Sequence, residues 1–388
     1  MNKMTIGVIT GSRADYGLLR WVIKGIKESK ELKLHLYVTG MHLSSIHGDS
    51  LNEIHNDGIL SYTKIETQLS SDTAASVSKS IGLGVIGFAD SFSQSRPDLL
   101  VILGDRYEVM PAAISALPFQ IPIAHLHGGE RTEGLIDEGI RHSITKLSHL
   151  HFVSTEEYRN RVIQLGECPN RVENVGALGI DNINKLSLLK KEEIENKINF
   201  KFGKKNLLVT YHPVTLCFTD QEHEICEILD ALETFKDITI IFTMTNADPY
   251  SHGIWLKIKQ FKKFNPNSLI IENMGSLVYL SILQVVDGVL GNSSSGIIEA
   301  PSLQTWTIDV GDRQKGRVKA ESVIKCSGKK KDVVKAINQI FSDGSKTMIK
   351  KFKNPYGSGG ASSKIVQKLK LVTPESLIQK KFYTTINS

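Results

Sequence analysis

A run of small and hydroxyl-bearing residues at 291–303, GNSSSGIIEAPSL, carries the clearest chemistry in the sequence. It follows an apolar stretch and opens a helical pattern, so Ser293 and Ser294 fall where the first helical N–H groups lack partners. A helix N-terminus of this kind holds a diphosphate through those N–H groups and the positive end of the helix dipole. Glu299 comes about one and a half turns later, within reach of a ribose diol. The alternative is a serine-capped helix that binds nothing.

Two basic loops could contact the same phosphates. Residues 11–17, GSRADYG, follow an apolar strand pattern; Arg13 could hold a phosphate, and Gly17 leaves room in the loop. The spacing is not G-x-G-x-x-G, which disfavours a nicotinamide cofactor. Residues 309–317, DVGDRQKGR, could close over the diphosphate through Arg313. Basic loops that merely face solvent are the alternative for both segments.

Acid–base chemistry is indicated first by LGDRYE at 103–108. Asp105 and Arg106 directly follow a strand pattern of leucine, valine and isoleucine. Partial desolvation there would raise the pKa of an aspartate toward the range useful for proton transfer. An Asp105 that caps a helix and pairs with Arg106 is the structural alternative.

The segment 125–149 concentrates histidines and carboxylates. Asp137 and Arg141 lie four residues apart, as do Glu138 and His142, so each pair shares a helix face and can form an ion pair. The spacing matches no H-E-x-x-H or comparable metal motif, which favours acid–base work over metal binding. The remaining titratable residues of the segment are His125, His127, Glu130 and Glu133.

A lone histidine follows the first strand pattern of the second half. In TYHPVT, Pro213 restricts the backbone and directs His212 toward the end of the strand, where ligands bind in α/β folds. A histidine with a purely structural role is the alternative.

Alternating strand and helix patterns position these motifs. The predicted strands of the first half are 6–10, 34–39, 99–103, 121–126 and 149–154, and those of the second half are 206–211, 238–244, 268–271, 285–290 and 306–310. Such alternation predicts two Rossmann-like, doubly wound α/β domains facing a cleft, with ligands at the carboxyl ends of the strands. The expected domains are 1–178 with the acid–base residues, 179–362 with the nucleotide site, and a helix and tail at 363–388 that packs back on the first domain.

Composition bounds the remaining possibilities. The chain has 388 residues, too many for one ordinary core, and a net charge of +6. We expect a cytoplasmic protein, because no signal sequence and no membrane-spanning apolar run is evident. Four scattered cysteines without a C-x-x-C pair argue against structural zinc. The lysine runs lack interleaved aromatic residues, which disfavours nucleic acid as a partner.

Taken together, the motifs resemble the hydrolysing UDP-N-acetylglucosamine 2-epimerases of bacterial sialic acid biosynthesis and the epimerase half of the bifunctional vertebrate enzyme. The resemblance runs from about residue 6 to the final helix, through GSRADYG, VTGMHLS, LGDRYE, H-x-x-GGE, IRHSITKLSH, HPVT, GNSSSGIIEAPSL and GDRQKGR. It implies the GT-B fold of two Rossmann-like domains, a homodimer, and a reaction that needs no metal or other cofactor.

The reaction implied by the resemblance has two steps. A base removes the proton at the second sugar carbon while UDP leaves, and water then adds to the 2-acetamidoglucal to give N-acetylmannosamine. By motif match, Asp105 and Asp137 are acid–base candidates, and His212 assists at the diphosphate or leaving group. The positions implied to contact the sugar nucleotide are Arg13, Gly17, Arg106, Arg141, His212, Asn246, Met274, Ser293, Ser294, Glu299 and Arg313.

One departure from the family pattern bears on the chemistry. Many relatives carry glutamate where His127 stands, in an H-x-E-G-G pattern that supplies a catalytic carboxylate. Here His127 or Glu130 would have to take that role.

Three alternatives stay open. The same chemistry could act on UDP-2,4-diacetamido-2,4,6-trideoxyglucose in a legionaminic acid pathway. A GT-B glycosyltransferase would share the fold and the diphosphate loop, although the density of titratable groups at 125–142 exceeds what group transfer needs. A nucleotide-sugar sensor without turnover is the third, and only the missing glutamate at His127 supports it.

Overall fold

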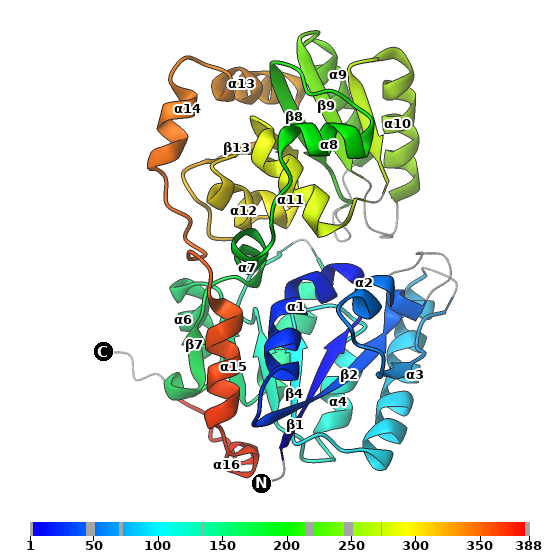
Figure 1. Cartoon of the computed structure of the whole chain (residues 1–388), viewed down its shortest axis with the longest axis vertical. Helices are drawn as coiled ribbons and strands as arrows, with labels where there is room; N and C mark the ends of the chain where they lie inside the picture. Colours follow the sequence, from blue (N-terminus) through cyan, green and yellow to red (C-terminus); the bar gives the residue numbers. More distant parts are fainter. Residues whose placement is uncertain are drawn as a thin grey trace. The chain divides into compact units, whose positions relative to one another are not determined.

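Two compact units make up the described part of the chain. The computed structural model describes residues 3–43, 51–69, 73–133, 135–213, 221–243, 251–272 and 274–384 (Figure 1). Unit 1 comprises Met1–Glu130, Asp137–Asn182 and Gly359–Ser388, and unit 2 comprises Arg131–Ile136 and Ile183–Ser358. Each unit is built on its own parallel sheet, which confirms the predicted fold class.

Unit 1 contains a seven-stranded parallel sheet in the order β3-β2-β1-β4-β5-β6-β7. Its strands are β1 (Met4–Thr10), β2 (Leu32–Thr39), β3 (Thr63–Ile65), β4 (Leu99–Leu103), β5 (Ile123–Leu126), β6 (Leu150–Val153) and β7 (Val172–Asn174). All five residues of β4 are buried, as expected for a central parallel strand covered on both faces.

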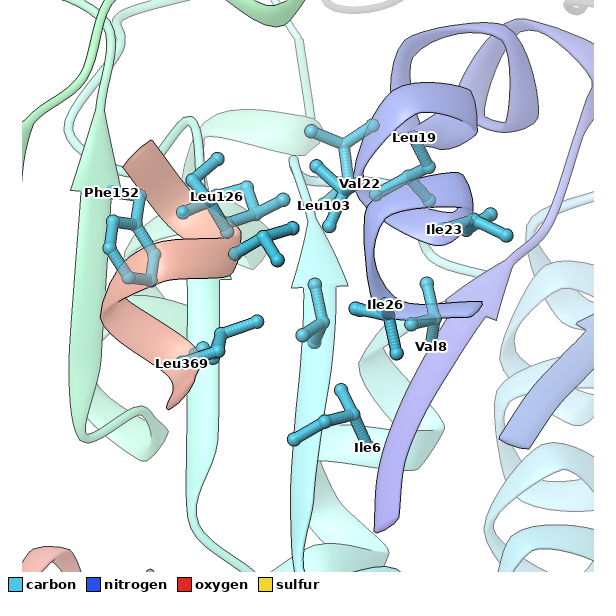
Figure 2. Packing of buried hydrophobic residues seen from close by; sticks show 14 of the residues in the cluster. Ile6, Val8, Leu19, Val22, Ile23, Ile26, Leu103, Leu126, Phe152 and Leu369 are labelled. Carbon is cyan, nitrogen blue, oxygen red and sulfur yellow. The ribbon is translucent and has the colours of Figure 1, made fainter. Parts of the chain in front are cut away.

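Helices cover both faces of this sheet. They are α1 (Arg13–Lys27), α2 (Leu51–Asn56), α3 (Ala74–Gln94), α4 (Met110–Ala116), α5 (Asp137–Leu147), α6 (Glu156–Gln164), α7 (Leu178–Lys185), α15 (Ala361–Leu371) and α16 (Pro374–Ile378). On one face, Ile6 and Val8 of β1 pack with α1 and with Leu369 of α15 (Figure 2). On the other face, Leu100 and Ile102 of β4 pack against α3 and α4.

Unit 2 repeats the plan with a six-stranded parallel sheet in the order β10-β9-β8-β11-β12-β13. Its strands are β8 (Lys205–Thr210), β9 (Ile238–Thr243), β10 (Ser268–Ile271), β11 (Gly288–Gly291), β12 (Trp306–Val310) and β13 (Val323–Cys326). Its helices are α8 (Lys191–Ile198), α9 (Gln221–Glu233), α10 (Ser251–Phe264), α11 (Gly275–Val285), α12 (Ser294–Ile298), α13 (Lys330–Ile340) and α14 (Ser345–Met348).

Both sheets have a topological switch point at the pair of strands where the chain order reverses. In unit 1 the pair is β1 and β4, and in unit 2 it is β8 and β11. Ligands of doubly wound folds bind beyond the carboxyl ends of the strands at this point. The motifs GSRADYG and LGDRYE follow β1 and β4, and TYHPVT and GNSSSG follow β8 and β11. The topology therefore brings the predicted motifs together in pairs.

Some element predictions were wrong in detail. The strand predicted at 285–290 is β11 at Gly288–Gly291, because Val285 completes α11, whose apolar side chains are also buried. The predictions omitted β3, β7 and β13, which are strands of three or four residues. No helix within the described ranges is both long and apolar enough to span a membrane.

Candidate active site

A buried arginine organises the carboxyl edge of the first sheet. Arg141 lies on α5 with only 1% of its side chain exposed, and it forms an ion pair with Asp105, which directly follows β4 and Gly104. Its Nη1 also contacts Glu138 Oε2 at 3.3 Å and donates to the Glu130 carbonyl oxygen at 2.9 Å. One guanidinium thus joins the loop after β4, the loop after β5 and the first turn of α5.

Asp105 consequently pairs with Arg141 and not with its sequence neighbour. Arg106 instead binds Glu108, with Nη2 and Oε1 3.0 Å apart. An aspartate held against a guanidinium is present as the carboxylate, which accepts a proton. Asp105 therefore has the chemistry of a base at the edge of β4.

The first turn of α5 supplies further titratable groups. Asp137 is its first residue, and Glu138 Oε1 lies 3.1 Å from His142 Nε2, so the predicted pairing of Glu138 with His142 is confirmed. His142 Nδ1 is buried without a hydrogen-bond partner among the described residues. The first two turns of α5 therefore carry two carboxylates and an imidazole on the same helix as Arg141, the residue that pairs with Asp105.

His127 has both ring nitrogens engaged. The Leu178 N–H donates to its Nε2 at 3.3 Å, which makes Nε2 an acceptor, so Nδ1 carries the proton and donates it to Glu130 Oε1 at 2.9 Å. Ser154 Oγ donates to the same carboxylate oxygen at 3.0 Å. His127 also has a φ of +62°, in the left-handed region that few side chains adopt. Proton transfer by His127 would first require one of these hydrogen bonds to open.

Sequence reasoning missed Asp15, which lies in the GSRADYG motif. Asp15 follows Ser12, the N-cap of α1, and its Oδ2 is buried without a hydrogen-bond partner among the described residues. Burial raises the pKa of Asp15 to about 6 against the opposing effect of Arg106, and Glu108 adds to the rise. The only sequence signal for Asp15 was its carboxyl group within the motif. The sequence pattern instead indicated Arg13, the first residue of α1, as the functional residue of this loop.

His42, which follows β2, was also missed. It is 3% exposed, and its Nε2 lies 2.9 Å from Thr10 Oγ1 at the end of β1. Burial lowers the pKa of His42 to about 4, so the ring is neutral at physiological pH. Its motif VTGMHLS is part of the family resemblance, but nothing in that motif singled out His42, which lies beside Thr10 only through the pairing of β1 with β2.

In unit 2, Asn292 fastens the loops after β8 and β11 to each other. The His212 N–H donates to Asn292 Oδ1 at 2.7 Å, and Asn292 Nδ2 donates to the His212 carbonyl at 2.8 Å. Arg313 Nη1 and Gln314 Nε2 both donate to the Asn292 carbonyl oxygen, at 3.1 and 2.8 Å. Asn292 lies within the predicted diphosphate loop, but the sequence pattern indicated only phosphate binding by the neighbouring serine hydroxyls. It did not indicate that Asn292 links the two loops.

His212 is a neutral imidazole beside an arginine. Burial lowers the pKa of His212 to about 3, and the nearby Arg313 charge contributes. Its Nδ1 is buried without a hydrogen-bond partner among the described residues. The predicted residues His212 and Arg313 are therefore brought together at the edge of the second sheet.

The GNSSSG segment forms a tight strand-to-helix turn. Ser293 is the N-cap of α12, and its side chain accepts from the Ser295 N–H at 3.4 Å. Gly291 has a φ of +139°, and a Cβ there would lie 1.8 Å from the Thr210 carbonyl oxygen, so only glycine fits. Glu299 ends α12.

Met274 directly precedes α11, whereas Asn246 lies outside the described residues. Within the residues that the structure describes, no group of three His, Cys, Asp or Glu side chains is arranged to hold a metal ion.

Two doubly wound parallel sheets, of seven and six strands, each with polar motifs at its switch point, define a GT-B-like fold. The structure of UDP-GlcNAc 2-epimerase from Neisseria meningitidis bound to UDP-GlcNAc has this fold, with a TM-score of 0.80 at 17% identity, covering 94% of this chain and 99% of that one.

Sequence comparisons show the family. A family model described as UDP-N-acetylglucosamine 2-epimerase matches residues 24–370. The chain is 40% identical over 325 residues to GDP/UDP-N,N'-diacetylbacillosamine 2-epimerase (hydrolyzing) from Campylobacter jejuni, covering 84% of each protein. It is also 40% identical over 353 residues to polysialic acid biosynthesis protein P7 from Escherichia coli, covering 90% of this chain and 89% of that protein. The chain belongs to the UDP-N-acetylglucosamine 2-epimerase family and is a UDP-sugar 2-epimerase of the hydrolysing type.

Proposed function

We propose that the protein converts UDP-N-acetylglucosamine and water to N-acetylmannosamine and UDP, in sialic acid biosynthesis. In the first step a base takes the proton from the second sugar carbon, and the bond from the first carbon to UDP breaks, giving 2-acetamidoglucal. In the second step water supplies a hydroxyl to the first carbon, and a proton returns to the second carbon from the opposite face. The observation that carries the proposal is Asp105 at the switch point of the first sheet, held as a carboxylate by Arg141.

The acid and base roles follow from the contacts in unit 1. Asp105 is the base in this proposal, because its ion pair with Arg141 holds it in the carboxylate form that a base needs. Asp137 is the second acid–base group, at the first residue of α5. His127 and Glu130 support the loop after β5, since the two side chains are hydrogen-bonded to each other and to Leu178 and Ser154. The role of the missing family glutamate thus passes to the carboxylates of α5.

Unit 2 supplies the nucleotide contacts in this proposal. Arg313, with Ser293 and Ser294 at the start of α12, binds the diphosphate, and Glu299 binds the ribose. His212 is neutral, so it donates a hydrogen bond to the leaving diphosphate without adding a charge. In unit 1, Arg13 supplies a positive charge that can bind a phosphate.

The test is incubation with UDP-N-acetylglucosamine in deuterated water, followed by proton NMR. The expected products are UDP and N-acetylmannosamine with deuterium at the second carbon. Asp105→Asn should abolish exchange, whereas Asp237→Asn, at a position 63% exposed, should leave the rate unchanged. UDP release without deuterium would contradict the elimination, whereas no UDP release until an acceptor is added would favour a glycosyltransferase. UDP binding without turnover of any sugar nucleotide would favour a sensor.

A second candidate substrate is UDP-2,4-diacetamido-2,4,6-trideoxyglucose. The relative from Campylobacter jejuni, named for a diacetylated bacillosamine sugar, is as similar to this chain as the polysialic acid protein, at 40% identity each. Parallel assays with the two sugar nucleotides separate the candidates by kcat/KM. A ratio above about tenfold for the diacetamido sugar would replace the first candidate.

We also propose that the protein is a homodimer through α3 and α4. Only two of the 21 residues of α3, Lys79 and Asp90, are charged. Apolar side chains on these two packed helices and at the C-cap of α4 are exposed, namely Leu83 (43%), Ile86 (62%), Ile114 (37%) and the C-cap residue Leu117 (60%). A weakly charged apolar face of this kind can meet a second copy of itself without repulsion between like charges.

Light scattering tests the dimer. The wild type should have twice the mass of one chain, and Ile86→Glu combined with Leu117→Glu should give monomers. Leu256→Glu, which replaces an exposed apolar residue of α10, is the matched control and should leave the mass unchanged. A wild type that is monomeric at micromolar concentration would contradict the proposal.

A further inference from the structure

Glu108 is a buried carboxylate with a single clear partner. Its side chain is 1% exposed, and it binds the Arg106 guanidinium along one edge. Arg106 Nε lies 3.3 and 3.2 Å from the two carboxylate oxygens, and Nη2 lies 3.0 Å from Oε1. Such a two-point contact fixes the plane of a guanidinium as well as its position.

The loops after β1 and β2 are shaped around Glu108. A Cβ on Gly11 would lie 3.1 Å from Glu108 Cβ, and a Cβ on Gly40 would lie 2.8 Å from Glu108 Cγ. Gly40 also has a φ of +56°, which disfavours a side chain there. The Met41 N–H donates to the Gly11 carbonyl at 2.8 Å and holds the two loops together. Glycine at the ends of two neighbouring strands thus gives Glu108 its space.

Arg106 reaches outward from this buried anchor. Its side chain is 27% exposed, and its Nη2 also lies 3.9 Å from Met41 Sδ. Its charge lowers the pKa of Asp15, which burial raises, so a second carboxyl lies nearby. Without Glu108, the Arg106 side chain would be able to adopt many rotamers, and the Asp15 carboxyl would compete for its guanidinium.

We propose that Glu108 is a positioning residue that fixes Arg106 at the carboxyl edge of β4, next to Asp105, for contact with the sugar nucleotide. The inference rests on the proposed function, because it takes the sugar nucleotide as the ligand of Arg106. A prepositioned arginine binds substrate and transition state alike, so its disorder raises KM more than it lowers kcat.

A double-mutant cycle tests the proposal. Glu108→Gln should raise KM for the sugar nucleotide about tenfold or more with kcat changed less than threefold, and Arg106→Gln should do the same. In the Arg106→Gln background, Glu108→Gln should change KM less than twofold, because it acts only through Arg106. Effects on KM that multiply would overturn the proposal, as would a Glu108→Gln variant with wild-type KM.

Glu167→Gln is the matched control. Glu167 is an equally buried carboxylate of unit 1, 2% exposed and bound to Lys146 and Lys380. Its substitution is expected to lower the unfolding midpoint while leaving KM within twofold of the wild type. A KM rise as large as that of Glu108→Gln would show that any loss of a buried carboxylate has this effect and would overturn the proposal.

A measurement without substrate separates this inference from the proposed function. Phenylglyoxal modifies accessible arginines, and mass spectrometry reports the rate at Arg106. Faster modification of Arg106 in Glu108→Gln than in wild type and Glu167→Gln supports the positioning role, even if no sugar nucleotide is turned over. Equal rates in the three proteins would overturn the positioning role, even if the wild type is an active epimerase.

Discussion

At the scale of single residues, burial sets the charge of the groups nearest the switch points. Asp15 in unit 1 and His212 in unit 2 are both buried. Burial raises the pKa of Asp15 and lowers the pKa of His212, so it favours the neutral form of each side chain. Asp105 differs, because Arg141 compensates its charge. The effects of burial on Asp15 and on His212 can therefore be tested separately by substitution.

Asp15→Asn should stabilise the protein in a pH-dependent way. The pKa of Asp15 rises from 3.8 to about 6 on folding, so the folded state binds more protons and loses stability as pH rises through that window. The variant should gain roughly 1 to 3 kcal/mol over wild type at pH 7 and almost nothing near pH 4. Urea unfolding at both pH values measures the gain. Asp90→Asn, at an exposed position of α3, is the control, and an equal gain at both pH values would contradict the prediction.

His212→Asn should lower kcat by about 100-fold through loss of a hydrogen bond to the leaving diphosphate. The pKa of His212 is lowered to about 3, so the ring does not ionise between pH 5 and 8. The acid limb of the pH–rate profile should therefore keep its midpoint in the variant. A midpoint that moves by a full pH unit would show that His212 titrates in this range.

At the scale of elements, the helix α15 depends on one carboxylate of α7. Asp181 is 1% exposed and accepts from the backbone N–H groups of Gly360, Ala361 and Ser362 at 2.6, 3.2 and 2.7 Å. The first N–H groups of a helix otherwise lack partners, and a negative charge there is favourable. Asp181 therefore fixes where α15 begins.

Asp181→Ala should destabilise unit 1 by about 2 kcal/mol, because it leaves these N–H groups buried without an acceptor. Asp181→Asn retains one acceptor oxygen and should cost less. Hydrogen exchange at residues 360–362 should accelerate in the alanine variant. Unchanged exchange there, with an unchanged unfolding midpoint, would be the contrary result.

At the scale of the whole molecule, buried histidines make the fold sensitive to acid. Burial lowers the pKa of His42 and His149 to about 4 and that of His125 and His212 to about 3. An unfolded chain binds protons at these groups near pH 6.5, whereas the folded chain does not. Stability should therefore fall as pH falls from about 6.5 toward 4.

The free energy of unfolding should drop by several kcal/mol between pH 7.5 and pH 5. Denaturant titrations at the two pH values measure it, and His125→Asn should reduce the drop. His125 serves as the test site because its ring contacts Thr145 Oγ1 and the Gly104 carbonyl within the core of unit 1. Equal stability at both pH values would contradict the prediction.

Much of the fold could be predicted, because the apolar runs that indicate its strands extend over only a few consecutive residues. The strands β4, β10 and β12 were predicted with their observed bounds; β4 and β12 are buried along their whole length, and parallel strands covered on both faces read as continuous apolar runs. The edge strands β3, β7 and β13 were missed, because their three or four residues include polar side chains and form no continuous apolar run, so only pairing with a neighbouring strand defines them.

The sequence by itself determined the α/β class, the order of the motifs and their positions after the strands, because strand and turn patterns extend over only a few residues. Only the tertiary structure decided that Asp105 pairs with Arg141 and Arg106 with Glu108, and that Asn292 joins two loops of unit 2. Burial determines these pairs, because a buried charge or amide without a hydrogen-bond or ion-pair partner is energetically costly. The partner is whichever group the folded chain places within reach. That choice depends on distances across the sheet, which spacing along the sequence does not encode.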